Sequence, residues 1–374
     1  MRVAATVWIP DRSPGPGRLA DVELEVLAVG DARLELPALV VEDVRGGLGL
    51  DRRDDLRADP SGGGGPFEAP AARREARAFG IANAAFHLRR AVARFEHLLG
   101  RPLPPLVCRI GMHGERRPPW GGGHYRLPAP SYRTLPEDSP PSPDGEIHIG
   151  PGARYGRAGG RRYFLAPSHN AAILVHEAGH HLTRHTADFR MNRSRPRAAQ
   201  ANRKVPLDEG TADFVAAIVL GTPDIYGWHR GATPDGAPDR RRLDLPRTMA
   251  EWRGGRVADP HVDGSIWASA LWAAREATLA AGAPAEAFDR LVVAGLDRLG
   301  TVEAGPPDEA RLSRRRHLGR FLEAILAADR DGGTGLGPLI EDVLAERGIR
   351  RGLDNDTMRD VFLDGEVAVG EAAQ

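Results

Sequence analysis

The sequence from Ala171 to His185 reads AAILVHEAGHHLTRH, and it decides how the rest of the chain can be interpreted. Within it, His176, Glu177 and His180 form the pattern H-E-x-x-H. Residues i and i+4 of a helix lie one above the other on the same face, so the two imidazoles can bind one metal ion. Glu177 then stands beside that ion, where a carboxylate can take a proton from a metal-bound water.

The residues before this motif indicate a helix that enters the protein core. Five apolar residues, Ala171 to Val175, precede His176, and Ser168 or Asn170 could cap the first helical turn. The competing interpretation is an ordinary helix with a polar histidine face. Two later segments of the chain favour the metal site.

A catalytic zinc usually takes three protein ligands and a water, so a third ligand is needed. The pattern H-E-x-x-H-x-x-G-x-x-H would supply another histidine, but Thr183 and Thr186 occupy its later positions. Glu209, in the helical stretch Leu207–Leu220, is the other candidate. Asp213 follows on the same helical face, where an acid can accept the free N–H of a zinc-bound histidine. The alternative is a helix whose first turn is acidic because of the helix dipole.

The charge balance, the cysteine content and the lack of long apolar runs limit the kinds of partner and the cellular location that can be expected. The 374 residues carry 51 basic and 51 acidic side chains, so the zero net charge gives no electrostatic reason to expect nucleic acid or a membrane as partner. Cys108 is the only cysteine, which excludes an internal disulfide. The sequence contains no apolar run long enough for a membrane span, and the first residues lack the core of a secretory signal. We therefore expect a cytoplasmic protein.

Periodicity and turn signals predict an α+β fold in three parts. Residues 1–70 form a β-rich segment that ends in a Gly-rich linker, with strands expected at Val3–Ile9, Val22–Val29 and Arg33–Val44. Residues 71–190 form an α/β lobe that carries the metal helix, with a long helix over Ala71–Leu99 and strands at Leu106–Ile110, Glu146–Ile149 and Tyr163–Leu165. Residues 191–374 form a helical lobe, with helices at Leu207–Leu220, Ile266–Leu279, Ala285–Gly300, Arg311–Asp329 and Leu336–Arg347.

Residues 111 to 145 are expected to be a loop, because they are rich in glycine and proline. Trp120, His124 and Tyr125 stand among three glycines in this loop. These aromatic side chains could line a substrate cleft, or they could simply pack the loop itself.

Three segments of the chain together resemble a known family. HEAGHHLT at 176–183, DEGTADFVA at 208–216 and DPHVDGSIWASALW at 259–272 are similar to the gluzincin zinc metallopeptidases. The similarity is greatest to the fungalysin-like group, with thermolysin a more distant relative. It extends from residue 75 to residue 350 and does not include the β-rich segment 1–70. It implies a thermolysin-like fold of two lobes with the substrate cleft between them.

The resemblance also implies a role for each matching residue. It makes His176, His180 and Glu209 the zinc ligands, Glu177 the general base, and Asp213 the acid behind a ligand histidine. It matches His261, expected in a loop before a helix that begins near Ser265, with the histidine that stabilises the tetrahedral intermediate. It matches Arg241 or Arg242 with an arginine that binds the substrate carbonyl.

Two departures from the family qualify this resemblance. No tyrosine lies between His181 and Glu209, where thermolysin-like enzymes have a further oxyanion group. The Gly-x-Met-Glu-Asn signature of the gluzincin aminopeptidases is also missing, which favours an endopeptidase.

The sequence thus predicts a zinc-dependent peptidase that acts on peptide or protein substrates. One alternative is a zinc-dependent amide hydrolase with a non-peptide substrate. The other is a non-proteolytic binding protein with a structural zinc, although such a site has no need of the base Glu177.

Overall fold

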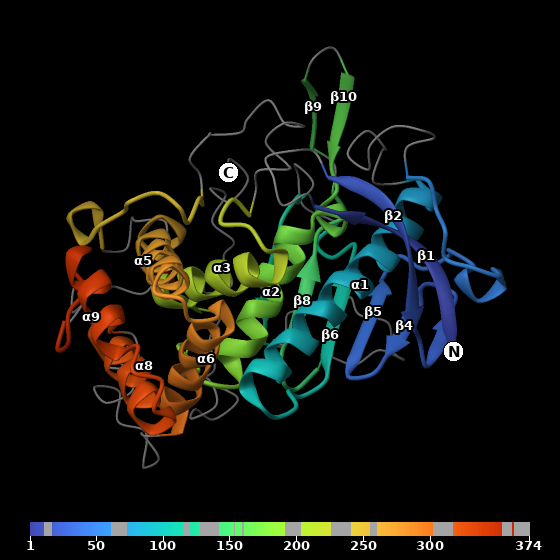
Figure 1. Ribbon diagram of the computed structural model, residues 1–374. Helices are drawn as coiled ribbons and strands as arrows, with labels where there is room; N and C mark the ends of the chain where they lie inside the picture. Colours follow the sequence, from blue (N-terminus) through green and yellow to red (C-terminus); the bar gives the residue numbers. More distant parts are fainter. Residues whose placement is uncertain are drawn as a thin grey trace.

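The computed structural model describes residues 1–10, 17–60, 73–114, 120–127, 142–152, 154–158, 161–190, 203–225, 241–254, 260–301, 317–353 and 361–362. In these ranges two helices pack against a mixed sheet, and further helices lie beside them (Figure 1). The expected α+β architecture is therefore confirmed. The Gly-rich stretch at 61–70 and the expected helix start at Arg311 lie outside the described residues.

The main sheet has six strands in the order β3-β4-β5-β6-β8-β7. These strands are β3 (Ala28–Gly30), β4 (Arg33–Leu36), β5 (Leu39–Asp43), β6 (Leu106–Ile110), β8 (Glu146–Ile149) and β7 (Gly123–Arg126). The β5–β6 and β6–β8 pairs are parallel, and the others are antiparallel. Because β5 pairs directly with β6, the sheet crosses the expected boundary near residue 70.

Three smaller strand pairs complete the β-structure of the described residues. They are β1 (Arg2–Ile9) with β2 (Arg18–Glu25), β9 (Arg154–Ala158) with β10 (Arg161–Leu165), and β11 (Arg203–Lys204) with β12 (Val361–Phe362).

Strand β7 corrects the expectation that all of residues 111–145 form a loop. Tyr125 pairs with Ile147 and Gly123 with Ile149, so β7 forms the outer edge of the sheet beside β8. Its residues show no local alternation of apolar side chains. The strand therefore depends on its pairing with β8, a tertiary contact that local propensity does not encode.

The described helices form two groups on either side of the segment that carries the H-E-x-x-H motif. Helices α1 (Arg74–Leu99) and α2 (Ala171–Arg184) pack on the sheet, and α3 (Pro206–Leu220) packs on α2. Beyond α3 lie α5 (Pro260–Ala280), α6 (Ala285–Thr301), α8 (Leu318–Gly332) and α9 (Gly337–Glu346) (Figure 1). Short 3-10 turns occur at η1 (Leu50–Arg52), η2 (Pro167–His169) and η4 (Met249–Glu251). None of the described helices combines the length and the apolar character needed to cross a membrane.

The start of α5 corrects a second expectation. The helix begins at Pro260 rather than near Ser265, so His261 lies in its first turn and not in a loop. Proline suits a first helical turn, where its missing N–H needs no partner and its φ angle is already helical.

Three glycines allow α2, α3 and α5 to approach one another closely. A methyl group at Gly179 of α2 would lie 2.8 Å from the Cα atom of Ala212 in α3. A methyl group at Gly264 of α5 would lie 2.7 Å from the Pro206 carbonyl oxygen, and one at Gly210 of α3 would collide with the Gly264 carbonyl. The backbones of these helices thus touch where a side chain would separate them.

We predict that Gly210→Ala destabilises the protein because its methyl group must push α3 away from α5. Overpacking of this kind costs about 1–3 kcal/mol of unfolding free energy. Gly332→Ala, at the end of α8, is the matched control because its methyl group meets only the Thr334 Cγ2 atom, at 3.8 Å. Urea unfolding should show the loss for Gly210→Ala alone. Equal stability of the two variants would contradict the close approach.

Candidate metal centre

Helix α2 places the three residues of the H-E-x-x-H motif in the protein interior. Of the two candidate caps, Asn170 caps the helix, since its side chain accepts a hydrogen bond of 3.1 Å from the Ile173 N–H. The apolar residues that follow pack into the core, and His176, Glu177 and His180 are all buried.

Helix α3 brings Glu209 to the same point as the two histidines. The Glu209 Oε2 atom lies 3.1 Å from His176 Nε2 and 3.2 Å from His180 Nε2, and these two nitrogens are 3.2 Å apart. Zinc ligands at 2.0–2.1 Å in a tetrahedron are about 3.3–3.4 Å from one another. The three atoms are therefore spaced as the ligands of one metal ion would be.

A buried acid stands behind each of the two histidines. His176 Nδ1 lies 2.9 Å from Asp213 Oδ1, and His180 Nδ1 lies 3.1 Å from Asp208 Oδ2. An acid that accepts the Nδ1–H of a histidine leaves the Nε2 lone pair available to a metal. Of the two contacts, that of His176 has hydrogen-bond geometry, with Arg241 Nη2 also 2.8 Å from the same nitrogen, and that of His180 is an ion-pair contact. The sequence had indicated Asp213 but not Asp208, although Asp208 directly precedes Glu209 in the first turn of α3.

Arginines hold these acids in place. Arg241 donates from Nε to Asp213 Oδ2 at 2.9 Å, and Arg190 donates to Asp208 Oδ2 at 2.7 Å. Arg242 instead bonds Asp244 at the surface. Of the two arginines that the sequence offered, Arg241 is therefore the one that the structure brings to the candidate centre.

The electrostatics of the centre favour a bound cation. Burial alone would raise the pKa of Asp208, but His180 and Arg190 lower it to about 2. Burial likewise opposes ionisation of Glu209 and Asp213. His180, His261 and His176 nevertheless lower the pKa of Glu209, and Arg241 and His176 lower the pKa of Asp213. The pKa of His180 rises to about 10 because Asp208 and Glu209 outweigh the effect of burial. A metal ion bound to His180 would displace the proton from its ring, so metal binding would depend on pH.

Glu177 faces a cleft beside the proposed ligand atoms. Its Oε2 atom is buried and has no hydrogen-bond partner in the described part of the chain. Unpaired buried oxygens are costly, which suggests that a water or a substrate normally meets this one. The cleft is lined by residues of β7, α2 and α3 with others, namely Gly123, His124, Tyr125, Arg126, His176, Glu177, His180, Arg190, Lys204, Glu209 and His261.

His261 reaches the same carboxylate from the first turn of α5. Its Nε2 atom lies 3.1 Å from Glu209 Oε2. Its side chain is 18% exposed, compared with 4% or less for the side chains of His176, His180 and Glu209. The nitrogen is close enough to be a fourth metal ligand. It is equally placed to face a substrate at the mouth of the cleft.

Comparison with known proteins does not assign this chain to a family. No protein-family model matches its sequence, and no curated protein is significantly similar to it. The geometry of the candidate centre is therefore the basis on which a function can be proposed.

Proposed function

We propose that the protein is a zinc-dependent peptidase with a thermolysin-like arrangement of two lobes. The observation that carries this proposal is the convergence of His176, His180 and Glu209 next to the unpaired carboxylate oxygen of Glu177. Two imidazoles and one carboxylate with a free position for water are typical of catalytic zinc. The position of α2 and α3 between the sheet and the remaining helices supports the two-lobed arrangement.

A zinc ion at this centre would polarise the scissile carbonyl and acidify a bound water. Glu177 accepts a proton from that water and later delivers it to the leaving nitrogen. Asp213 and Asp208 keep the ring orientations of His176 and His180 fixed during the reaction. His261 donates a hydrogen bond to the carbonyl oxygen as negative charge develops there.

The edge strand β7 favours a peptide over a small amide as the substrate. It lines one wall of the cleft, and no described strand pairs with its outer side. An extended peptide can add to such an edge through backbone hydrogen bonds, which would bring its scissile bond into the cleft beside Glu177. This cleft would suit an endopeptidase.

A structural zinc site is the second candidate, and the position of His261 favours it. If its Nε2 atom joined the other three ligands, the coordination would be closed and no water could bind. Glu177 would then have no proton to accept.

We predict that Glu177→Gln retains zinc but loses hydrolysis by a factor of about 10² to 10⁴, because an amide cannot act as the general base. The assay is cleavage of a denatured protein with and without a chelator, together with the zinc content. Glu276→Gln is the control, since Glu276 is an exposed acid of α5. Hydrolysis by Glu177→Gln at the parental rate would exclude Glu177 as the base.

We predict that His261→Phe also keeps its zinc, while turnover falls by about 10² to 10³ with little change in KM. The reason is that a hydrogen bond to the oxyanion acts mainly in the transition state. His261→Gln retains an N–H donor and should recover part of the turnover. Loss of zinc from His261→Phe would instead make this residue a ligand and favour the structural site.

A further inference from the structure

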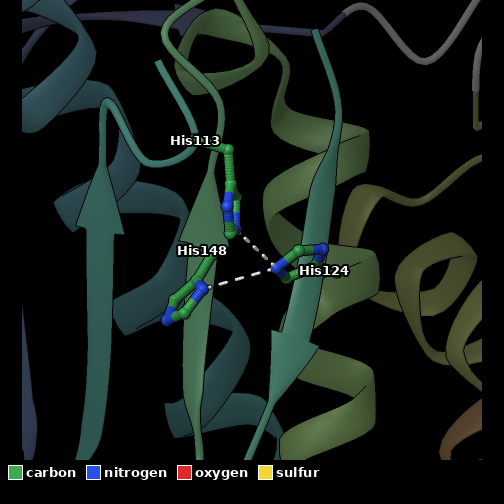
Figure 2. A group of neighbouring side chains, drawn as sticks. All are labelled: His113, His124 and His148. Carbon is green, nitrogen blue, oxygen red and sulfur yellow. Dashed lines mark hydrogen bonds between the residues drawn. The ribbon is translucent and has the colours of Figure 1, made fainter. Parts of the chain in front are cut away.

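A second group of histidines lies on the opposite face of the sheet. His124 of β7 stands directly across from His148 of β8, and His113 belongs to the turn after β6 (Figure 2). The neighbouring residues of β7 face α2, since Gly123 approaches Glu177 and the Tyr125 hydroxyl lies 3.2 Å from His181 Nδ1. Because side chains alternate along a strand, His124 points away from α2.

The ring nitrogens of these histidines converge on one point. His124 Nε2 lies 3.2 Å from His113 Nε2 and 3.3 Å from His148 Nδ1 (Figure 2). A neutral imidazole nitrogen has either one hydrogen or one lone pair, so His124 Nε2 cannot hydrogen-bond fully to both neighbours. A cation between the three nitrogens could instead be bound by a lone pair from each ring. The two separations are close to the edge of a tetrahedral zinc site, about 3.3 Å.

His148 is already held in the tautomer that a metal requires. Its Nε2 lies 2.6 Å from Glu146 Oε1, so the N–H donates there and leaves the Nδ1 lone pair facing His124. Glu146 also accepts hydrogen bonds of 3.0 Å from Arg109 Nε and from the Ser142 N–H. A carboxylate that holds the far side of a histidine ring is the usual support of a metal-bound imidazole.

The other two rings are fixed by their surroundings. His113 has a φ angle of 60°, a left-handed backbone that few residues other than glycine adopt. Backbones of this kind persist where the surrounding structure requires them and are frequent at functional sites. The Trp120 ring lies against both histidines, with centroids 4.5 Å from His124 and 5.0 Å from His113.

We propose that His113, His124 and His148 bind a second metal ion, a divalent transition metal such as zinc. Three imidazoles select ions of this class over calcium or magnesium, which prefer oxygen ligands. The ion ties the turn after β6 to β7 and β8. Since β7 also lines the cleft at the candidate centre, the ion would hold that wall of the cleft in place.

The test is the zinc content of the full-length protein after zinc loading and desalting. His113→Asn is the first variant, because asparagine tolerates a positive φ and the residue is only partly buried. His124→Gln is the second, and His97→Asn, on the exposed side of α1, is the control. Circular dichroism verifies that each variant is folded.

We expect both variants to hold one zinc ion fewer per chain than the parent and the control. His176→Phe should lose the ion of the candidate centre instead. The double variant with His176→Phe and His113→Asn should therefore hold two zinc ions fewer than the parent. If His113→Asn and His124→Gln keep the parental zinc content, the second site does not exist. If His176→Phe keeps the parental zinc content while His113→Asn and His124→Gln lose one ion, the second site binds zinc and the candidate centre does not.

Discussion

The close contact of three helix backbones is the constraint on which the candidate centre depends. Gly179 directly precedes His180, Gly210 directly follows Glu209, and Gly264 lies in the same turn as His261. At each of these glycines a side chain would meet the backbone of a neighbouring helix. The absence of side chains therefore sets the separation of α2, α3 and α5. That separation in turn sets the distances of 3.1–3.2 Å between the candidate ligand atoms.

Burial of charge gives the centre its second constraint. Asp208, Glu209 and Asp213 are almost completely buried, and such groups are expensive to ionise unless they are paired. Arg190 and Arg241 bond the two aspartates. Glu209 Oε2 faces histidine nitrogens at the distances given above, and Glu209 Oε1 lies 4.0 Å from Arg190 Nη2. A dication among these nitrogens would balance the carboxylate better than a proton on His180, and it would couple metal binding to folding.

The sequence predicts the parts of this centre that helix geometry controls. The four-residue spacing of His176 and His180 places both side chains on one face of α2. The same spacing places Glu209 and Asp213 on one face of α3. The pairing of β7 with β8 could not be predicted in this way, because it is a tertiary contact between strands that are well separated in the sequence. For the same reason the histidine group on the opposite face of the sheet could not be predicted from the sequence. Its members come from a turn and two strands that no local periodicity connects.

The most direct test of the central claim is anomalous diffraction at the zinc edge from crystals of the zinc-loaded protein. We expect a peak about 2.0–2.2 Å from the Nε2 atoms of His176 and His180 and from a carboxylate oxygen of Glu209. A zinc-loaded crystal without a peak there, or with Glu209 turned away from both histidines, would contradict it.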